Sequence, residues 1–134
     1  MKALQPYLNF QGTTRNAMTF YQQALGGQLD MQTFGDAQHA SANPDGVMHA
    51  QLKVGSIVLM ASDNMPDQKF VQGTNFWINI DCESVEEIER LFAALAAGGT
   101  VMMPLQDTFW GARFGMLTDK FRVQWMFNCE LKKG

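Results

Sequence analysis

The same arrangement of predicted elements occurs twice in this sequence. Apolar side chains recur at helical spacing in two separate segments. The first series is Ala17, Phe20, Tyr21, Ala24 and Leu25, and the second is Ile88, Leu91, Phe92 and Leu95. Each series ends at a pair of glycines, which commonly terminate helices, and the pairs Gly26-Gly27 and Gly98-Gly99 lie 72 residues apart. A repeat of this length predicts a duplicated architecture.

Each predicted helix follows one short strand and precedes three more. Strands are expected at 6–10, 28–35, 47–54 and 56–62, and again at 76–81, 100–105, 111–117 and 123–129. We therefore expect an α+β fold in which two tandem βαβββ modules form a curved mixed sheet around a cavity. The chain is expected to be a single domain, residues 1–134, with module one at 3–63, a polar linker at 64–73 and module two at 74–130.

Helix caps are predicted at both starts. Thr13 or Thr14 can cap the first helix. The run from Ser84 to Glu87 has the spacing of a capping box before the second helix. Glu83, Glu86, Glu87 and Glu89 are expected on its solvated face.

Strand alternation predicts which side chains line the cavity, because successive side chains point to opposite faces of a sheet. Pro6, Leu8 and Phe10 in one strand, and Phe76, Ile78 and Ile80 in its counterpart, are expected to pack on the helices. The expected cavity lining is Gln5, Tyr7, Asn9, His49, Gln51, Lys53, Met60, Ser62, Asn75, Trp77, Asn79, Arg113, Gln124, Met126 and Asn128.

Charge and hydropathy narrow the range of partners and compartments. The net charge of −3, without a basic run, gives no basis for a nucleic-acid partner. No apolar stretch reaches the roughly 20 residues that cross a bilayer, so no membrane partner is expected. The N-terminus becomes polar too early for a signal peptide. Cys82 and Cys129 lack Cys-x-x-Cys spacing, and we expect reduced thiols in a cytoplasmic protein, although pairing between them stays open.

Several segments resemble a known family. They are Pro6-Tyr7-Leu8, Ala24-Leu25-Gly26-Gly27, Met48-His49-Ala50, Leu59-Met60-Ala61-Ser62-Asp63, Asp107-Thr108-Phe109-Trp110-Gly111-Ala112-Arg113-Phe114-Gly115 and Thr118-Asp119-Lys120-Phe121. Nearly end to end, the chain resembles the PhnB-like branch of the vicinal oxygen chelate (glyoxalase/bleomycin resistance/dioxygenase) superfamily. The resemblance implies two βαβββ modules and a homodimer. The chain departs from that branch at Arg122, where the branch usually has a glycine that tolerates positive φ.

Metal-dependent members of the superfamily hold their ion between the first and last strands of each module. Carried over by position, these four places are Gln5, Met60, Asn75 and Met126. Thioethers and neutral amides are poor ligands for divalent first-row metals, which bind imidazole, carboxylate or thiolate. We therefore expect no metal and no other cofactor.

His49 is the best candidate for chemistry because imidazole titrates near neutral pH. It is either a general base or ligand contact in the cavity, or a structural residue hydrogen-bonded across the sheet. Arg113 presents a planar donor fork that suits an anionic group of a ligand, or it forms a salt bridge with Asp107 or Asp63. His39 is expected to be solvated.

Aromatic and acidic residues complete the candidate site. Trp77 and Trp110 either stack on a flat ligand or complete the core, and for Phe109 the core is favoured. Asp107 is a ligand-binding candidate because it shares the specific block with Arg113. Asp63 and Asp119 are interpreted as turn residues.

Other chemistries find no support in the sequence. There is no phosphate-binding glycine loop, no Gly-x-Ser-x-Gly elbow and no glycine-rich loop for S-adenosylmethionine, so the 3-demethylubiquinone 3-methyltransferase label that the branch often carries is not supported. Three hypotheses remain. The favoured one is a metal-free protein that binds a small aromatic or anionic molecule. The alternatives are a lyase, isomerase or dioxygenase that uses His49 with Arg113 or a displaced metal, and a dimeric protein with a vestigial cavity.

Overall fold

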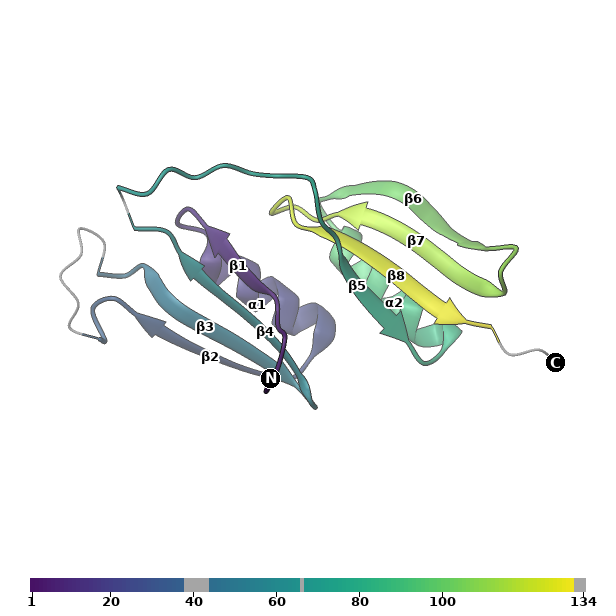
Figure 1. Cartoon of the computed structure of the whole chain (residues 1–134), viewed down its shortest axis with the longest axis horizontal. Coiled ribbons are helices and arrows are strands. Elements are labelled where there is room, and N and C mark those ends of the chain that lie inside the picture. Colours follow the sequence, from purple (N-terminus) through teal and green to yellow (C-terminus); the bar gives the residue numbers. More distant parts are fainter. Residues whose placement is uncertain (38–43, 66, 132–134) are drawn as a thin grey trace. The chain divides into compact units, whose positions relative to one another are not determined.

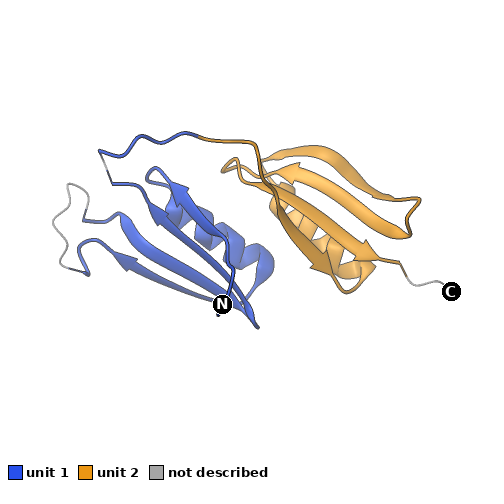
Figure 2. Cartoon of the chain, viewed as in Figure 1, with its two compact units in different colours: residues 1–71 blue, residues 72–134 orange. Residues whose placement is uncertain are grey.

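The structure is a computed structural model that describes residues 1–37, 44–65 and 67–131. The chain divides into two compact units, Met1–Val71 and Gln72–Gly134 (Figure 2). The boundary lies inside the linker expected at 64–73. His39 and part of the 36–46 loop lie outside the described residues.

The first unit is a four-stranded sheet with one helix on one of its faces (Figure 1). Its elements are β1 (Tyr7–Phe10), α1 (Thr14–Leu25), β2 (Gln28–Thr33), β3 (Val47–Val54) and β4 (Ile57–Asp63). The strand order is β1-β4-β3-β2, in which β1 is parallel to β4 and the other pairs are antiparallel.

The second unit repeats this plan. Its elements are β5 (Ile78–Cys82), α2 (Val85–Ala96), β6 (Thr100–Asp107), β7 (Ala112–Thr118) and β8 (Gln124–Glu130). The strand order is β5-β8-β7-β6, with β5 parallel to β8. The predicted α+β class and the duplicated βαβββ order are confirmed, as two separate four-stranded sheets.

Strand alternation separates a core face from a helix-free face in each sheet. The core faces bury residues that include Leu8, Leu52, Leu59 and Ala61 beneath α1, and Leu117, Trp125 and Phe127 beneath α2. We use the term helix-free face for the side of each sheet opposite its own helix. In the first unit it carries Tyr7, Asn9, Asp30, Gln32, His49, Gln51, Lys53, Met60 and Ser62. In the second it carries Asn79, Asp81, Phe114, Met116, Met126 and Asn128.

The prediction that Phe76 packs on a helix is wrong. Its side chain is 59% exposed, and β5 begins only at Ile78. The Gln124 side chain donates hydrogen bonds to the carbonyl oxygens of Thr74 and Phe76, at 3.2 and 2.6 Å. The segment before β5 is therefore held by the Gln124 side chain. It does not form the backbone hydrogen bonds with β8 that would lengthen β5.

The two Gly-Gly pairs mark the same geometric constraint in each unit. The second glycine of each pair begins the return from helix to sheet and lies against a strand backbone. A Cβ atom on Gly27 would overlap the carbonyl of Lys53, and one on Gly99 would overlap that of Thr118. In both units, therefore, the second glycine is needed because the backbone passes too close to a neighbouring strand for a side chain to fit.

A buried carboxylate, rather than a threonine, caps α1. The Thr13 side chain makes no capping hydrogen bond. Asp63 Oδ1 accepts hydrogen bonds from the backbone of Gly12 (3.1 Å) and from the backbone and hydroxyl of Thr14 (3.1 and 2.7 Å). Asp63 Oδ2 accepts from the backbone of Val47 at 2.9 Å. In the second unit, the Ser84 cap predicted for α2 is confirmed by the bond from Glu87 N to Ser84 Oγ.

Replacing Asp63 with alanine is expected to destabilise the first unit. The change leaves buried donors without an acceptor, and the expected loss is about 3 kcal/mol of unfolding free energy. Chemical denaturation followed by circular dichroism measures it, with Asp67→Ala at an exposed position as the control. A loss no larger than that of the control would contradict this role.

Arg122 is the non-glycine residue with positive φ among those described, at 69°. It lies in the turn between β7 and β8, where its backbone N–H donates to the Asp119 carbonyl and Asp119 Oδ1 accepts from the backbone of Phe121 and Val123. Asp119 is thus a turn residue, as predicted, and it also accepts from Trp125 Nε1 at 2.8 Å. The turn demands the left-handed conformation that glycine would adopt without strain.

Arg122→Gly is expected to raise stability by up to about 1 kcal/mol, because it removes the strain of a left-handed side-chain-bearing residue. Arg122→Ala keeps that strain and is the matched control. Thermal unfolding of the three proteins tests the expectation, and a lower melting temperature for the glycine variant than for the alanine variant would disprove it.

Candidate functional site

His49 lies on the helix-free face of the first unit, as predicted. It projects from β3, and its Nδ1 is hydrogen-bonded to the Tyr7 hydroxyl of β1 at 3.3 Å. The two rings are tilted by 38°, with centroids 5.9 Å apart. The contact fixes the orientation of the imidazole and directs Nε2 away from Tyr7.

A shallow hollow of about 300 Å³ adjoins His49. Its lining residues are Asp30, Met31, Gln32, His49 and Gln51. Register explains the grouping, because Asp30 lies opposite Gln51 and Gln32 lies opposite His49 in the antiparallel β2–β3 pair. The hollow therefore combines a carboxylate, two amides and an imidazole within one small area, whereas Met31 pairs with the core residue Ala50.

Asp30 and Gln32 were not among the residues expected from the sequence. The sequence does contain a signal for them, since alternate residues of β2 must share a face with their partners in β3. That signal becomes usable only when the pairing register is known. The β-bulge between Gln32 and Thr33 also changes the alternation at the end of β2.

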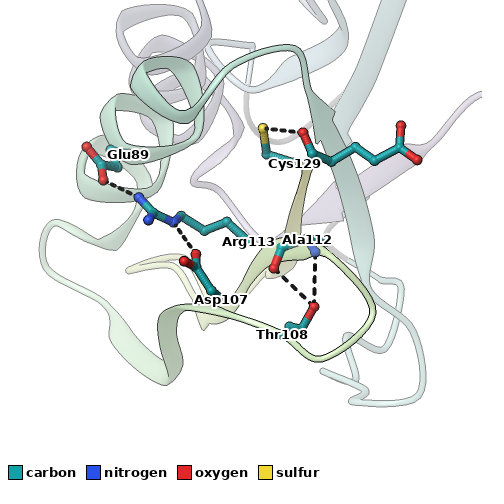
Figure 3. A network of polar contacts seen from close by, with 7 residues as sticks. Glu89, Asp107, Thr108, Ala112, Arg113 and Cys129 are labelled. Atoms are coloured by element: carbon teal, nitrogen blue, oxygen red, sulfur yellow. Dashed lines mark hydrogen bonds and ion pairs between the residues drawn. The ribbon is translucent and has the colours of Figure 1, made fainter. Parts of the chain in front are cut away.

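Arg113 does not lie on the helix-free face, and the prediction that it lines the cavity is wrong. Its Nη1 contacts Glu89 Oε1 of α2 at 2.6 Å, and its Nε donates to Asp107 Oδ1 of β6 at 2.9 Å (Figure 3). Gly115, two residues along β7, also faces α2, because a Cβ there would meet Phe92. The alternative that Arg113 pairs with Asp107 is confirmed.

The error has a simple origin in the repeat. Gln51 pairs with Met60 in the first unit, and Met116 pairs with Met126 in the second. Met126 follows Met60 by 66 residues, whereas Met116 follows Gln51 by only 65. The counterpart of His49 is therefore Phe114, and a shift of one residue moves Arg113 to the opposite face.

Two carboxylates compensate the Arg113 charge. The pKa of Arg113 is raised above its ordinary value, chiefly by the hydrogen bond to Asp107 and also by the charges of Asp107 and Glu89, against the opposing effect of desolvation. Glu89 was expected to be only solvated, but its half-exposed carboxylate holds this guanidinium. Asp107 is likewise engaged.

Of the four places carried over from the family, Met60 lies in β4 and Met126 lies in β8. Met60 is paired with Tyr7, and Met126 with Asn79. Gln5 and Asn75 are exposed and precede β1 and β5. Within each unit these places offer thioether, amide or phenol groups, which are poor ligands for a divalent metal. Within the described residues, no three His, Cys, Asp or Glu side chains are grouped closely enough to hold a metal ion.

The predicted aromatic residues lie around the β6–β7 turn and before β5. Phe109 is 98% exposed, so the expectation that it lies in the core is wrong. Trp110, which is 57% exposed, makes edge contacts with Phe109 and Phe114. Thr108 organises the turn through hydrogen bonds with the backbone of Ala112. Trp77 is partly buried ahead of β5.

Comparison with known proteins gives consistent matches. The family model for the glyoxalase/bleomycin resistance protein/dioxygenase superfamily matches residues 6–127. The chain is 38% identical to protein YjdN of Escherichia coli over 93% of both chains. Protein PA1353 from Pseudomonas aeruginosa has a similar structure, with a TM-score of 0.89, 50% identity and coverage of 97% of this chain and 100% of that one.

A second solved structure is similar over nearly the whole chain. It is a putative 3-demethylubiquinone-9 3-methyltransferase, PhnB protein, from Bacillus cereus, with a TM-score of 0.79, 25% identity and coverage of 96% of this chain and 99% of that one. The likeness extends over both units.

Arg113→Met is expected to reduce stability by only about 1 kcal/mol, because Glu89 and Asp107 are both more than half exposed and regain water when the pair is lost. Urea denaturation of Arg113→Met beside Glu89→Gln measures the effect. A loss above about 3 kcal/mol, the range of a broken buried pair, would contradict the structural description.

Proposed function

Because this chain belongs to the glyoxalase/bleomycin resistance protein/dioxygenase superfamily, we propose that it binds a small organic molecule on the helix-free face around His49. The observation that carries the proposal is the oriented His49–Tyr7 pair beside the hollow formed with β2. A pocket suited to a small ligand needs a few polar groups in defined positions among less polar neighbours.

The residues of this face favour a ligand with hydrogen-bonding groups on an otherwise apolar body. His49, Gln51 and Gln32 offer donors and acceptors, while the Tyr7 ring offers apolar contact. Asp30 makes the hollow itself acidic. Since Arg113 is held on the other face of its sheet, we propose a neutral or cationic aromatic ligand in preference to an anionic one.

The proposal includes a metal-free site. In neither unit do the paired side chains, Tyr7 with Met60 and Asn79 with Met126, suit a divalent cation. Elemental analysis of protein purified without chelators tests this part, and a stoichiometric transition metal would refute it.

A homodimer in the cytoplasm is part of the same proposal. Both sheets end in edge strands that can pair with another chain, which favours self-association. Apolar side chains such as Val101 and Met102 of the β6 edge strand are exposed. No helix of the described chain is long and apolar enough to cross a bilayer. Light scattering of purified protein measures the oligomeric state.

A catalytic role is the second candidate, and the His49–Tyr7 contact favours it. The Tyr7 hydroxyl occupies Nδ1 and leaves Nε2 of the imidazole to exchange a proton with a substrate. The superfamily's lyase, isomerase and dioxygenase reactions are the classes to assay. Arg113 has no part in this candidate, because its guanidinium faces α2.

Ligand-dependent thermal stabilisation tests the binding proposal. A screen of small neutral, cationic and anionic aromatic compounds is expected to give hits that raise the melting temperature, since a ligand specific to the folded state stabilises it. His49→Ala should weaken such a hit by about tenfold, the loss of one hydrogen bond to a polar group.

Control variants separate the site from general effects of mutation. Asn128→Ala removes a polar side chain from the helix-free face of the other unit and is expected to leave affinity unchanged. Hits that bind His49→Ala as tightly as the unmodified protein would place the site elsewhere. A preference for anionic hits would contradict the proposed ligand class.

A further inference from the structure

Four polar side chains form one row across the second sheet. Cys82 of β5 lies opposite Cys129 of β8, Cys129 lies opposite Arg113 of β7, and Arg113 lies opposite Asp107 of β6. Arg113 contacts Glu89 of α2, so the row lies on the face that α2 covers. This row is separate from the helix-free face on which ligand binding is proposed.

Both cysteines are free and buried, with 7% of Cys82 and 1% of Cys129 exposed. Neighbouring strands lie about 4.8 Å apart, which is within the Cα separation of about 4.4–6.8 Å that a disulfide requires. The Cys129 thiol donates to the Glu130 carbonyl at 3.7 Å (Figure 3). The register of β5 and β8 already brings the two residues opposite each other.

The two thiols have different electrostatic surroundings. Burial raises the pKa of the Cys82 thiol to about 12, and the negative charges of Glu87, Cys129 and Asp81 act in the same direction. Cys129 instead lies opposite Arg113 in the β7–β8 pair, so the positively charged residue of the row adjoins it. A positively charged neighbour favours reaction at Cys129 before Cys82.

The two cysteines occupy the places in the second unit that Phe10 and Asp63 occupy in the first. Cys82 pairs with Cys129 at the ends of β5 and β8, as Phe10 pairs with Asp63 at the ends of β1 and β4. Asp63 is fully used in holding α1 and β3. Ser84 caps α2, so the second unit does not need a carboxylate at that place.

We propose that Cys82 and Cys129 form an oxidisable dithiol, in which Cys129 reacts first and Cys82 closes the disulfide. With a hydroperoxide as oxidant, the Cys129 thiolate attacks the peroxide oxygen, the O–O bond breaks, and hydroxide or an alcohol leaves. The Cys82 sulfur then attacks the resulting sulfenic acid, and water leaves as the S–S bond forms. Overall, two thiols and one hydrogen peroxide give one disulfide and two waters.

The pair lies at the ends of its two strands. Cys82 is the last residue of β5, and Cys129 precedes the last residue of β8. Strand ends open locally at lower free-energy cost than the centre of a sheet. The bridge would then join the first and last strands of the second unit, and it would raise the melting temperature by several degrees.

Intact-mass measurement after treatment with hydrogen peroxide tests the proposal on the full chain. The unmodified protein is expected to lose about 2 Da, the mass of two hydrogens removed when a disulfide forms, and to regain it with dithiothreitol. Cys82→Ser should stop at a sulfenic acid on Cys129, which dimedone traps. Cys129→Ser should give less trapped sulfenic acid at Cys82. Arg113→Met, with both cysteines present, should form the bridge several-fold more slowly.

Each contrary result has a defined meaning. Absence of the 2 Da loss, or a disulfide that links two chains, would overturn the dithiol. Faster trapping in Cys129→Ser than in Cys82→Ser would overturn the assigned order. Circular dichroism before treatment shows whether a variant is folded, and the unmodified protein alone decides whether the bridge forms.

Discussion

A buried carboxylate determines how the first unit closes. Asp63 ends β4, and its two oxygens hold the start of α1 on one side and the start of β3 on the other. Because helix N-termini leave backbone N–H groups without partners, a buried start needs an acceptor from elsewhere in the fold. The strand that supplies it is also the strand that pairs with β1 and β3. One side chain therefore links the start of α1, the start of β3 and the end of β4.

In the second unit, the acceptor for the start of the helix comes from the helix's own first turn. The position that corresponds to Asp63 is therefore free for another residue. Ser84 caps α2, and Glu87 reaches back to the backbone of Glu83. The place of Asp63 is then occupied by Cys129, with Arg113 and Asp107 along the same row. Duplication thus conserved the path of the backbone while the buried polar chemistry diverged. The helix-free face diverged as well, since His49 corresponds to Phe114.

The candidate site was predicted only in part. The His49 side chain was placed on the correct face, because alternation within one strand is a local property. Arg113 was placed on the wrong face, because that prediction depended on the number of residues between equivalent strands of the two units. That number is 65 between β3 and β7 but 66 between β4 and β8. Asp30 and Gln32 were missed, since their approach to His49 depends on pairing between β2 and β3. Phe109 was expected in the core, although its turn leaves it exposed.

The sequence by itself determined the duplication, the two helices with their glycine ends, and the order of helices and strands along the chain. These follow from periodicity and from glycine's freedom at close backbone contacts, which act over a few residues. Only the tertiary structure decided the register of each pair, the partners of Asp63 and Arg113, and the alignment of Cys82 with Cys129. Those contacts join residues far apart in the chain, and a displacement of one residue reverses the face of every side chain in a strand.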